Sequence, residues 1–327
     1  MTDAGRPTIH VVAAFTTDAA GRILMVRKRG SEIFMQPGGK PEAGEAPAEA
    51  LVRELAEELL IEVDPDDLVG WGRYEADAAN EPGHALTADV FGLRLEHDAV
   101  TASAEIEEAR WFTRSEARAL GERLAPLARR MLEVPEVRSR FRPARFTAPL
   151  ETERLRIRMM TVDDIDAVHA YQSREDVARY MPWAPRSRED VADRVTAWAR
   201  ADRLGAEGDY LQLAVERRED GAMLGHLFAS VRSLDSLTAV VGWTLHPDHH
   251  GRGYATEAAR ALLGWLFDRV GFHRVIADLD PENAASAALS RRLGMRQEAH
   301  FRQDFWDGER WSDSAIFALL SHEFTGG

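Results

Sequence analysis

A glycine-rich segment at residues 37–45 runs directly into residues 47–59, where apolar and acidic residues recur at helical spacing. Pro47 suits the first turn of a helix, and leucines recur every four residues after it, which predicts an amphipathic helix. Glycines let a backbone approach a phosphate or a metal ion without obstruction by a Cβ atom. This loop and helix therefore constrain both the fold and the chemistry of the first half of the chain.

Three carboxylates of the predicted helix, Glu54, Glu57 and Glu58, lie at helical spacing. At 100° per residue they project about 60–160° to one side of Leu55, the centre of the apolar face. A solvated acidic face is the ordinary explanation for such a pattern. The glycine-rich loop next to it favours a second explanation, because clustered oxygen ligands are what Mg²⁺ or Mn²⁺ prefers when it also binds substrate phosphates.

The spacing from Gly39 through Glu45 and Arg53 to Ile61 resembles the Nudix box at eight of its nine constrained positions. The exception is Leu60, where that family has a glycine. The resemblance covers about residues 8–130 and implies a mixed sheet between helices, an α/β/α sandwich. It also implies hydrolysis of a nucleoside diphosphate linked to another group.

By position, the resemblance assigns the catalytic and metal-binding roles to Glu54, Glu57 and Glu58, with the carbonyl of Gly39 as a further metal ligand. Arg53 and Glu45 would form a supporting ion pair that orients the loop. Some members of the family add an acidic residue from outside the box, and the candidates here, which the sequence does not separate, are Glu105, Glu107 and Glu108. Because Leu60 replaces the glycine that usually ends this helix, it is expected to affect the turn after the helix more than the metal ligands, which precede it.

The organisation of the chain indicates two domains. A helix expected at residues 115–132 closes the first half, and residues 133–149 hold three prolines and four arginines without an amphipathic period. We therefore expect a first domain at residues 1–132, a linker at 133–149 and a second domain at 150–327. Both domains are expected to be of the α/β (α+β) class.

The second half alternates predicted strands and helices. Strands are expected at 155–159, 211–216, 221–231, 239–245, 274–279, 299–305 and 311–319, and helices at 162–171, 188–203, 256–270 and 284–293. A turn containing His246, His249 and His250 separates one strand from the next helix. A metal site is poorly supported there, because these histidines sit beside glycine or proline. Backbone N–H groups exposed by Gly251 and Gly253 at a helix N-terminus would instead suit a pyrophosphate.

The segment His250-Gly251-Arg252-Gly253-Tyr254-Ala255 resembles motif A of the GNAT acetyltransferases, with histidine where that family has glutamine or arginine. Residues 283–286 and 293–295 resemble later segments of the same family. Residues 150–158 and 304–308 resemble its ribosomal-protein N-acetyltransferase branch. The resemblance spans nearly all of residues 150–324 and implies a mixed-sheet acetyltransferase fold.

The GNAT resemblance implies acetyl transfer from acetyl-CoA to an amine, on a small molecule or a protein N-terminus. The expected cofactor-binding residues are Leu245, His250, Gly251, Arg252, Gly253, Tyr254, Ala255, Thr256 and Asn283. Ser286 is the candidate to protonate the leaving thiolate, although Asn283 and Ser286 also suit a helix N-cap. Related sequences often carry a glutamate base where this chain has Val240. The tryptophans that could line an acceptor groove, if they do not simply pack in the core or an interface, are Trp183, Trp243, Trp306 and Trp311.

Composition excludes several classes of protein. The chain of 327 residues has no cysteine, which rules out disulfides, cysteine-ligated zinc, iron–sulfur clusters and a cysteine nucleophile. Its net charge is −14, shared equally by the two halves, so neither nucleic acid nor an anionic membrane is an expected partner. No apolar run approaches the roughly 20 residues of a membrane helix, and residues 1–6 do not resemble a signal peptide. The expected location is the cytoplasm.

The sequence therefore favours a bifunctional enzyme that joins a metal-dependent hydrolase of nucleotide-derived molecules to an acetyl-CoA-dependent N-acetyltransferase. One alternative is a first domain that senses a nucleotide and regulates the acetyltransferase. Another is a hydrolase fused to a non-catalytic cofactor-binding domain. Val240 and His250 allow this alternative, because they differ from the residues usual in the family at these positions. The nucleotide, the amine, the base and the oligomeric state are not specified by the sequence.

Overall fold

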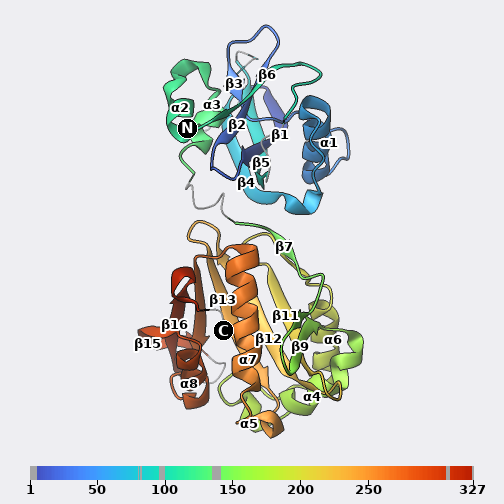
Figure 1. The fold of residues 1–327 in the computed structure, drawn as a ribbon, viewed down its shortest axis with the longest axis vertical. Helices are drawn as coiled ribbons and strands as arrows, with labels where there is room; N and C mark the ends of the chain where they lie inside the picture. Colours follow the sequence, from blue (N-terminus) through green and yellow to red (C-terminus); the bar gives the residue numbers. More distant parts are fainter. Residues whose placement is uncertain are drawn as a thin grey trace. The chain divides into compact units, whose positions relative to one another are not determined.

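A computed structural model describes residues 6–79, 81, 83–95, 100–134, 141–306 and 310–325. The chain divides into two compact units, Met1–Pro143 and Ala144–Gly327, each built on its own sheet (Figure 1). Outside the described residues lie parts of three segments that the sequence singled out, namely residues 1–5, 135–140 and 307–308. No helix within the described ranges combines the length and apolarity that crossing a bilayer requires.

The first unit is a mixed sheet of the order β3-β2-β1-β5-β4, with β6 paired to β2. Its strands are β1 (Thr8–Thr17), β2 (Ile23–Lys28), β3 (Phe34–Met35), β4 (Val69–Asp77), β5 (Ala85–Arg94) and β6 (Ile106–Phe112). Its helices are α1 (Pro47–Leu59), α2 (Arg114–Ala119) and α3 (Pro126–Met131), with short 3₁₀ turns at Pro65–Asp67 and Gly121–Arg123. The β1 and β5 strands run parallel and the other pairs antiparallel. Figure 1 shows α1 on one face of this sheet and α2 and α3 on the other, which confirms the predicted α/β sandwich.

Helix α1 packs Leu51, Leu55 and Leu59 into a core shared with β1 and β2. It ends at Leu60, whose backbone is left-handed with a φ of 54°. The N–H groups of Leu60 and Ile61 donate to carbonyls of the last helical turns. Leucine thus adopts the conformation for which a glycine is usual at this position, and the turn forms despite the missing glycine.

The helix predicted at residues 115–132 is wrong as a single element. It is broken into α2, a 3₁₀ turn and α3. Thr113 and Glu116 form a capping box that starts α2. Gly121 then takes a φ of 57°, and Pro126 starts α3 because proline favours the first turn of a helix over its interior.

The second unit is an eight-stranded mixed sheet of the order β15-β16-β14-β13-β12-β11-β9-β8. Its strands are β8 (Leu150–Glu151), β9 (Leu155–Met159), β11 (Tyr210–Arg217), β12 (Met223–Ser233), β13 (Thr238–Leu245), β14 (Arg274–Leu279), β15 (Arg296–Trp306) and β16 (Trp311–Leu320). Its helices are α4 (Ile165–Gln172), α5 (Glu175–Ala178), α6 (Arg188–Trp198), α7 (Tyr254–Gly264) and α8 (Ala284–Arg292), with a π-helical continuation of α7 at Trp265–Val270. Short 3₁₀ turns lie at Val162–Asp164, Pro247–His249 and Ser321–Glu323. In Figure 1, α7 lies across one face of this sheet.

Residues 144–149, which the sequence placed in the linker, belong to the second unit. The short strand β7 (Ala144–Arg145) pairs with β10 (Arg203–Leu204), and Phe146 is buried with its ring 5.3 Å from that of Trp265. The proline and arginine content of this segment did not predict these contacts, because the contacting residues lie more than 50 positions away in the sequence.

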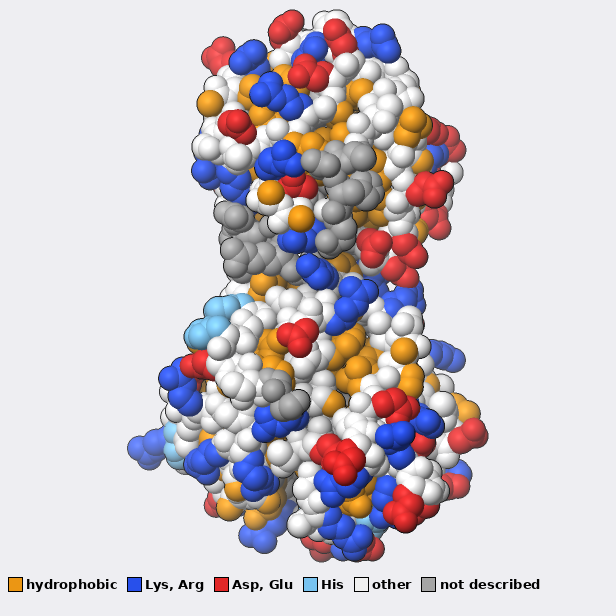
Figure 2. Space-filling view, viewed as in Figure 1, with side chains coloured by type: hydrophobic (Ala, Val, Ile, Leu, Met, Phe, Trp, Pro, Cys, Tyr) orange, Lys and Arg blue, Asp and Glu red, His pale blue; other side chains and the backbone are white. Residues whose placement is uncertain are grey.

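Charged side chains of both signs are interspersed on the face of each unit that Figure 2 shows. Neither unit presents a continuous basic surface on that face.

Candidate functional sites

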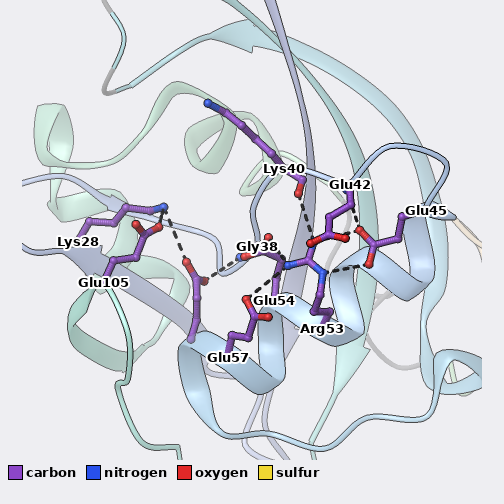
Figure 3. A network of polar contacts seen from close by, with 10 residues as sticks. Lys28, Gly38, Lys40, Glu42, Glu45, Arg53, Glu54, Glu57 and Glu105 are labelled. Atoms are coloured by element: carbon purple, nitrogen blue, oxygen red, sulfur yellow. Dashed lines mark hydrogen bonds and ion pairs between the residues drawn. The ribbon is translucent and has the colours of Figure 1, made fainter.

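The acidic flank of α1 faces the glycine-rich loop of the first unit. Glu54 accepts a hydrogen bond from Arg53 at 3.0 Å, and its carboxylate packs against Gly39 so closely that a Cβ on residue 39 would overlap it. Glu57 is more than half exposed and lies 3.4 Å from Arg53. Figure 3 shows these side chains grouped along one side of the helix. A side chain at position 39 would therefore force the Glu54 carboxylate to move.

Arg53 and Glu45 hold the loop in place, as the resemblance implied. The guanidinium meets both carboxylate oxygens of Glu45 at 3.0 Å, and a third bond reaches the carbonyl of Lys40 at 3.3 Å. Glu45 also accepts a 2.8 Å bond from the N–H of Glu42. Hydrogen bonding to Arg53 keeps the pKa of Glu45 below its usual range. This pair ties α1 to both ends of the loop.

Glu58 is the buried member of the flank, with 2% of its surface exposed. One carboxylate oxygen accepts a 3.2 Å bond from the N–H of Gly38, whereas Oε1 has no hydrogen-bond partner. Burial raises the pKa of Glu58 to about 7. Lys28, with Nζ 3.8 Å from Oε1, compensates the charge of this buried carboxylate only in part.

Of the three outer acidic candidates, the structure brings Glu105 toward the box. Glu105 forms an ion pair with Lys28, the same side chain that approaches Glu58 (Figure 3). Glu107 and Glu108 instead pair with Arg27 at 3.0 and 3.1 Å. The sequence could not separate the three, because Glu105 lies in the turn before β6 whereas Glu107 and Glu108 lie on β6 beside Arg27 of β2, and that pairing joins residues about 80 positions apart.

The oxygen atoms of Glu54, Glu57, Glu58 and the Gly39 carbonyl are of the kind that a divalent cation binds. Among the described residues, however, no three or more Asp, Glu or His side chains lie close enough together to hold one. The unpartnered Oε1 of Glu58 is a buried anionic oxygen that would gain from a cation. The carbonyl of Gly39 accepts a 2.9 Å bond from the N–H of Val12 and keeps a second lone pair. A metal ion would also require Glu57 to turn away from Arg53.

The second unit opens between β13 and β14. These parallel strands pair only from Thr238 to Val240 and from Arg274 to Ile276, after which β13 continues to Leu245 without β14 as a partner. A cavity of about 950 Å³ lies beside this opening. Its walls include the end of β13, the turn before α7 and the start of α8, together with residues 176–181 around α5.

Nearly all the cofactor-binding residues predicted from the sequence line this cavity. They are Leu245, His250, Gly251, Gly253, Tyr254, Ala255, Thr256, Asn283 and the candidate acid Ser286. Arg252 does not line it. Its carbonyl instead accepts a 3.1 Å bond from Arg154, whose guanidinium lies 4.7 Å from the ring centre of Tyr254 and pairs with Glu257 at 2.6 Å.

The turn before α7 has the geometry of an anion site. Gly253 is the N-cap residue of α7 with a φ of 81°, and Gly251 has a φ of 73°. The Nε2–H of His250 donates to the carbonyl of Leu245 at 3.0 Å and closes the turn. Free N–H groups at the start of a helix, aimed into a cavity, favour phosphate oxygens. The three histidines of the turn belong to no metal-binding group in the described part of the chain.

Asn283 and Ser286 combine a structural contact with a position on the cavity wall. The Asn283 side chain caps α8 by accepting a 3.0 Å bond from the N–H of Ser286. The Ser286 hydroxyl accepts a 3.2 Å bond from the indole N–H of Trp243. Asn283 and Ser286 therefore form the N-terminal cap of α8 and also line the cavity.

A second cavity of about 270 Å³ adjoins the first, and both are lined by Met181, Trp243 and Thr244. The sequence missed most of its polar residues, which come from separate elements and form no motif: Gln172, Arg186, Arg194, Gln212 and His226. Trp183 and Trp243 line it too, two of the four tryptophans for which the sequence left both an acceptor groove and ordinary packing open. Trp306 and Trp311 lie elsewhere, exposed and 5.5 Å apart on the β15–β16 hairpin.

The structure supplies no obvious base in place of the glutamate that Val240 replaces. No carboxylate lines the second cavity. The two that line the first, Asp176 and Glu257, are each paired with an arginine. His226 is fully buried beside Tyr171, and burial lowers its pKa to about 3, so its imidazole is neutral.

Comparisons with known proteins divide the chain in the same way. The NUDIX domain family matches residues 7–134, and the acetyltransferase (GNAT) domain family matches residues 154–296. The uncharacterized N-acetyltransferase YnaD of Bacillus subtilis (strain 168) is 31% identical over 176 residues, 54% of this chain and 98% of that protein. The [ribosomal protein uS5]-alanine N-acetyltransferase of Escherichia coli (strain K12) is 26% identical over 87 residues, 27% of this chain and 45% of that protein.

Among solved structures, a GNAT-family acetyltransferase from Bacillus anthracis is 31% identical and covers 54% of this chain and 99% of its own, with a TM-score of 0.48. The NUDIX match covers the strands of the first sheet, and the GNAT match covers β9, β11, β12, β13 and β14 of the second. The chain belongs to the GNAT acetyltransferase family through its second unit and carries a NUDIX domain as its first.

Proposed function

We propose that the second unit transfers an acetyl group from acetyl-CoA to an amine. The observation that carries this proposal is the αL turn at Gly251 and Gly253, which opens into a large cavity at the point where β13 and β14 separate. Backbone N–H groups of Gly253, Ala255 and Thr256 would bind the pyrophosphate, and Asn283 would contact the rest of the cofactor.

The chemistry needs few groups from the protein. The amine nitrogen attacks the thioester carbonyl carbon, a C–N bond forms and the C–S bond breaks. The nitrogen then loses one proton, and the CoA thiolate gains one. Ser286 is the proposed donor to the thiolate, because its hydroxyl is fixed by Trp243 on the cavity wall. Since no carboxylate lines the acceptor side, we propose that the amine enters neutral and that water carries its proton away.

For the first unit we propose hydrolysis of a nucleoside diphosphate linked to another group. Glu54, Glu57 and Glu58 would hold Mg²⁺ or Mn²⁺, together with the carbonyl of Gly39. When bound, the metal neutralises the diphosphate and activates water. Arg53 and Glu45 position the loop, and Lys28, which already pairs with Glu105, would give up its approach to Glu58 if a cation were bound there.

A nucleotide sensor is the second candidate for the first unit. Two observations favour it: the carboxylates of α1 do not form a three-membered group among the described residues, and Lys28 already approaches the buried Glu58. In that case the unit would bind a nucleotide without cleaving it and would regulate acetyl transfer.

A paired screen separates these functions. Nucleoside diphosphate derivatives are incubated with the full chain and Mg²⁺ or Mn²⁺, and phosphate-containing products are measured. Release of CoA thiol is followed in parallel on a panel of amines, with and without each nucleotide. Metal-dependent cleavage supports the hydrolase. Nucleotide binding that changes thiol release without any cleavage supports the sensor. Absence of thiol release with every amine would contradict acetyl transfer.

A further inference from the structure

The second cavity of the acetyltransferase unit has an unusual polar lining. Arg186, from the segment before α6, and Arg194, from α6 itself, both reach it. No aspartate or glutamate lines it. In a unit that is net negative, a small cavity with two arginines and no carboxylate is a distinct chemical environment.

Arg186 is held by neutral partners. Its guanidinium donates to Oε1 of Gln172 at 2.7 Å and lies 4.2 Å from the ring centre of Trp183. No acidic side chain of the described residues lies within 4 Å of it. The nearby Asp190 is engaged with the hydroxyl of Ser187 at 2.7 Å. Burial and the charge of Arg194 lower the pKa of Arg186 to about 10, and the charge of Asp190 offsets this effect only in part.

A guanidinium without an ion-pair partner binds an incoming anion more favourably than one that is already paired. The planar guanidinium is already oriented by Gln172 and Trp183, so little side-chain entropy is lost when it binds a carboxylate with two parallel bonds. Arg194 adds a second positive charge on the same wall. The cavity therefore has a preformed position for one negative group.

The same cavity has a position for a hydrogen-bond donor. Oε1 of Gln212, a residue of β11, is buried without a hydrogen-bond partner. An amide oxygen in this position accepts an N–H bond that water or a ligand must supply. The neutral imidazole of His226 and the hydroxyl of Thr244 complete the uncharged polar part of the lining.

The cavity is connected to the proposed reaction centre through Trp243. That residue lines both cavities, and its indole N–H donates to Ser286. A molecule in the smaller cavity can therefore direct one end toward the acetyl group and the other toward Arg186. A volume of about 270 Å³ suits a molecule the size of a single amino acid.

We propose that the acetyl acceptor is a small amine that also carries an anionic group, as amino acids do, with Arg186 as the anion-binding residue and Arg194 in support. This inference rests on the proposed acetyl transfer. Polyamines fit poorly, because every one of their charges would approach arginine and no carboxylate would receive them.

The test compares amines that differ only in the anion. Thiol release from acetyl-CoA is measured with each amino acid and its uncharged carboxamide, and with phosphoethanolamine and ethanolamine, which distinguish a phosphate from a carboxylate. We expect kcat/KM to favour the anionic member by roughly 30-fold. Arg186→Gln should remove that preference and leave the KM of acetyl-CoA unchanged. Arg186→Lys should restore part of it.

Arg188→Gln is the matched control, because Arg188 is exposed two residues away and pairs with Asp166. Equal rates for acid and amide, or a preference for spermidine or an uncharged peptide N-terminus, would overturn the proposal. Calorimetry with N-acetyl amino acids and N-acetylphosphoethanolamine, the expected products, tests binding without turnover. Binding that Arg186→Gln abolishes supports the anion site even if acetyl transfer fails, whereas no binding to the unmodified chain refutes it.

Discussion

The carboxylate of Glu54 lies directly against the backbone of Gly39, in the space that a side chain on residue 39 would occupy. Gly39→Ala should displace Glu54 by about an ångström and lower metal-dependent hydrolysis about 100-fold while the fold is kept. Gly70→Ala is the control, because a Cβ there meets no atom within 4 Å. Turnover with Mg²⁺ and thermal unfolding measure the two effects. Full activity of Gly39→Ala would show that Glu54 is not a ligand.

Glu58→Gln should reduce hydrolysis about 100-fold or more, because it removes the charge of a buried carboxylate whose Oε1 has no hydrogen-bond partner. The metal-free protein should melt at the same temperature or higher, since a buried charge is lost with little change in volume. Glu57→Gln should also lose activity, whereas Glu49→Gln, exposed on the same helix, should not. Unchanged metal-dependent turnover in both site variants would refute the assignment.

Gly253→Val should abolish detectable acetyl-CoA binding in calorimetry. A φ of 81° is unfavourable for a β-branched residue, and the added Cβ would lie 3.4 Å from the guanidinium of Arg154. Gly208→Val carries the same backbone cost, with a φ of 89°, but lies outside the cavity. If Gly208→Val lost binding equally, the effect would be one of stability. Hydrolysis by the first unit should survive in both variants.

His250→Gln should preserve or tighten acetyl-CoA binding. The imidazole contributes one donor to the Leu245 carbonyl at 3.0 Å, and a glutamine amide can make the same bond. The substitution also restores the residue type that GNAT sequences often carry here. A loss of binding greater than about tenfold would mean that the imidazole itself contacts the cofactor.

A fragment of residues 144–327 should unfold at a higher temperature than one of residues 150–327. The longer fragment keeps the β7–β10 pairing and the buried ring of Phe146 against Trp265. Burial of a phenylalanine contributes about 2 kcal/mol, so a difference of several degrees is expected. Equal melting temperatures would mean that residues 144–149 add nothing to the stability of the second unit and act as a linker.

Acid should destabilise the second unit partly through His226. Its pKa is about 3 in the folded protein and near 6.5 when unfolded, so the unfolded chain binds more protons between these values. The free energy of unfolding therefore rises with pH across that window, by up to about 1.4 kcal/mol per unit. In denaturant titrations at pH 4.5 and 7, His226→Gln should show a smaller difference than the unmodified chain. An identical difference would mean that His226 is already protonated in the fold.

Local patterns predicted the parts of the structure that depend on neighbouring residues. The α1 helix, the turn at Gly253 and the capped start of α8 at Asn283 each follow from a short stretch of sequence. The break in the helix expected at 115–132 could have been anticipated from Gly121 and Pro126. The apolar residues of this segment recur at helical spacing, which led to the prediction of a single helix.

The features that the sequence did not predict depend on distant contacts. Arg186, Gln172 and Gln212 meet in one cavity although they come from three elements, and none belongs to a motif. Glu105 lies in the turn before β6 and Glu107 lies on the strand, and this difference decides which basic side chain each one meets. Such contacts are fixed by the packing of the whole unit, which periodicity and spacing do not contain.

Leu60 shows what a signature glycine encodes. Its side chain is 63% exposed and meets no crowding, and its left-handed backbone costs about 1–2 kcal/mol that a glycine would avoid. The burial of Leu59 and Ile61 on either side can offset that cost. In this chain a leucine thus keeps the dihedral angle that a glycine usually supplies at this position. A sequence search that insists on glycine at this position would discard chains whose helix ends in the same geometry.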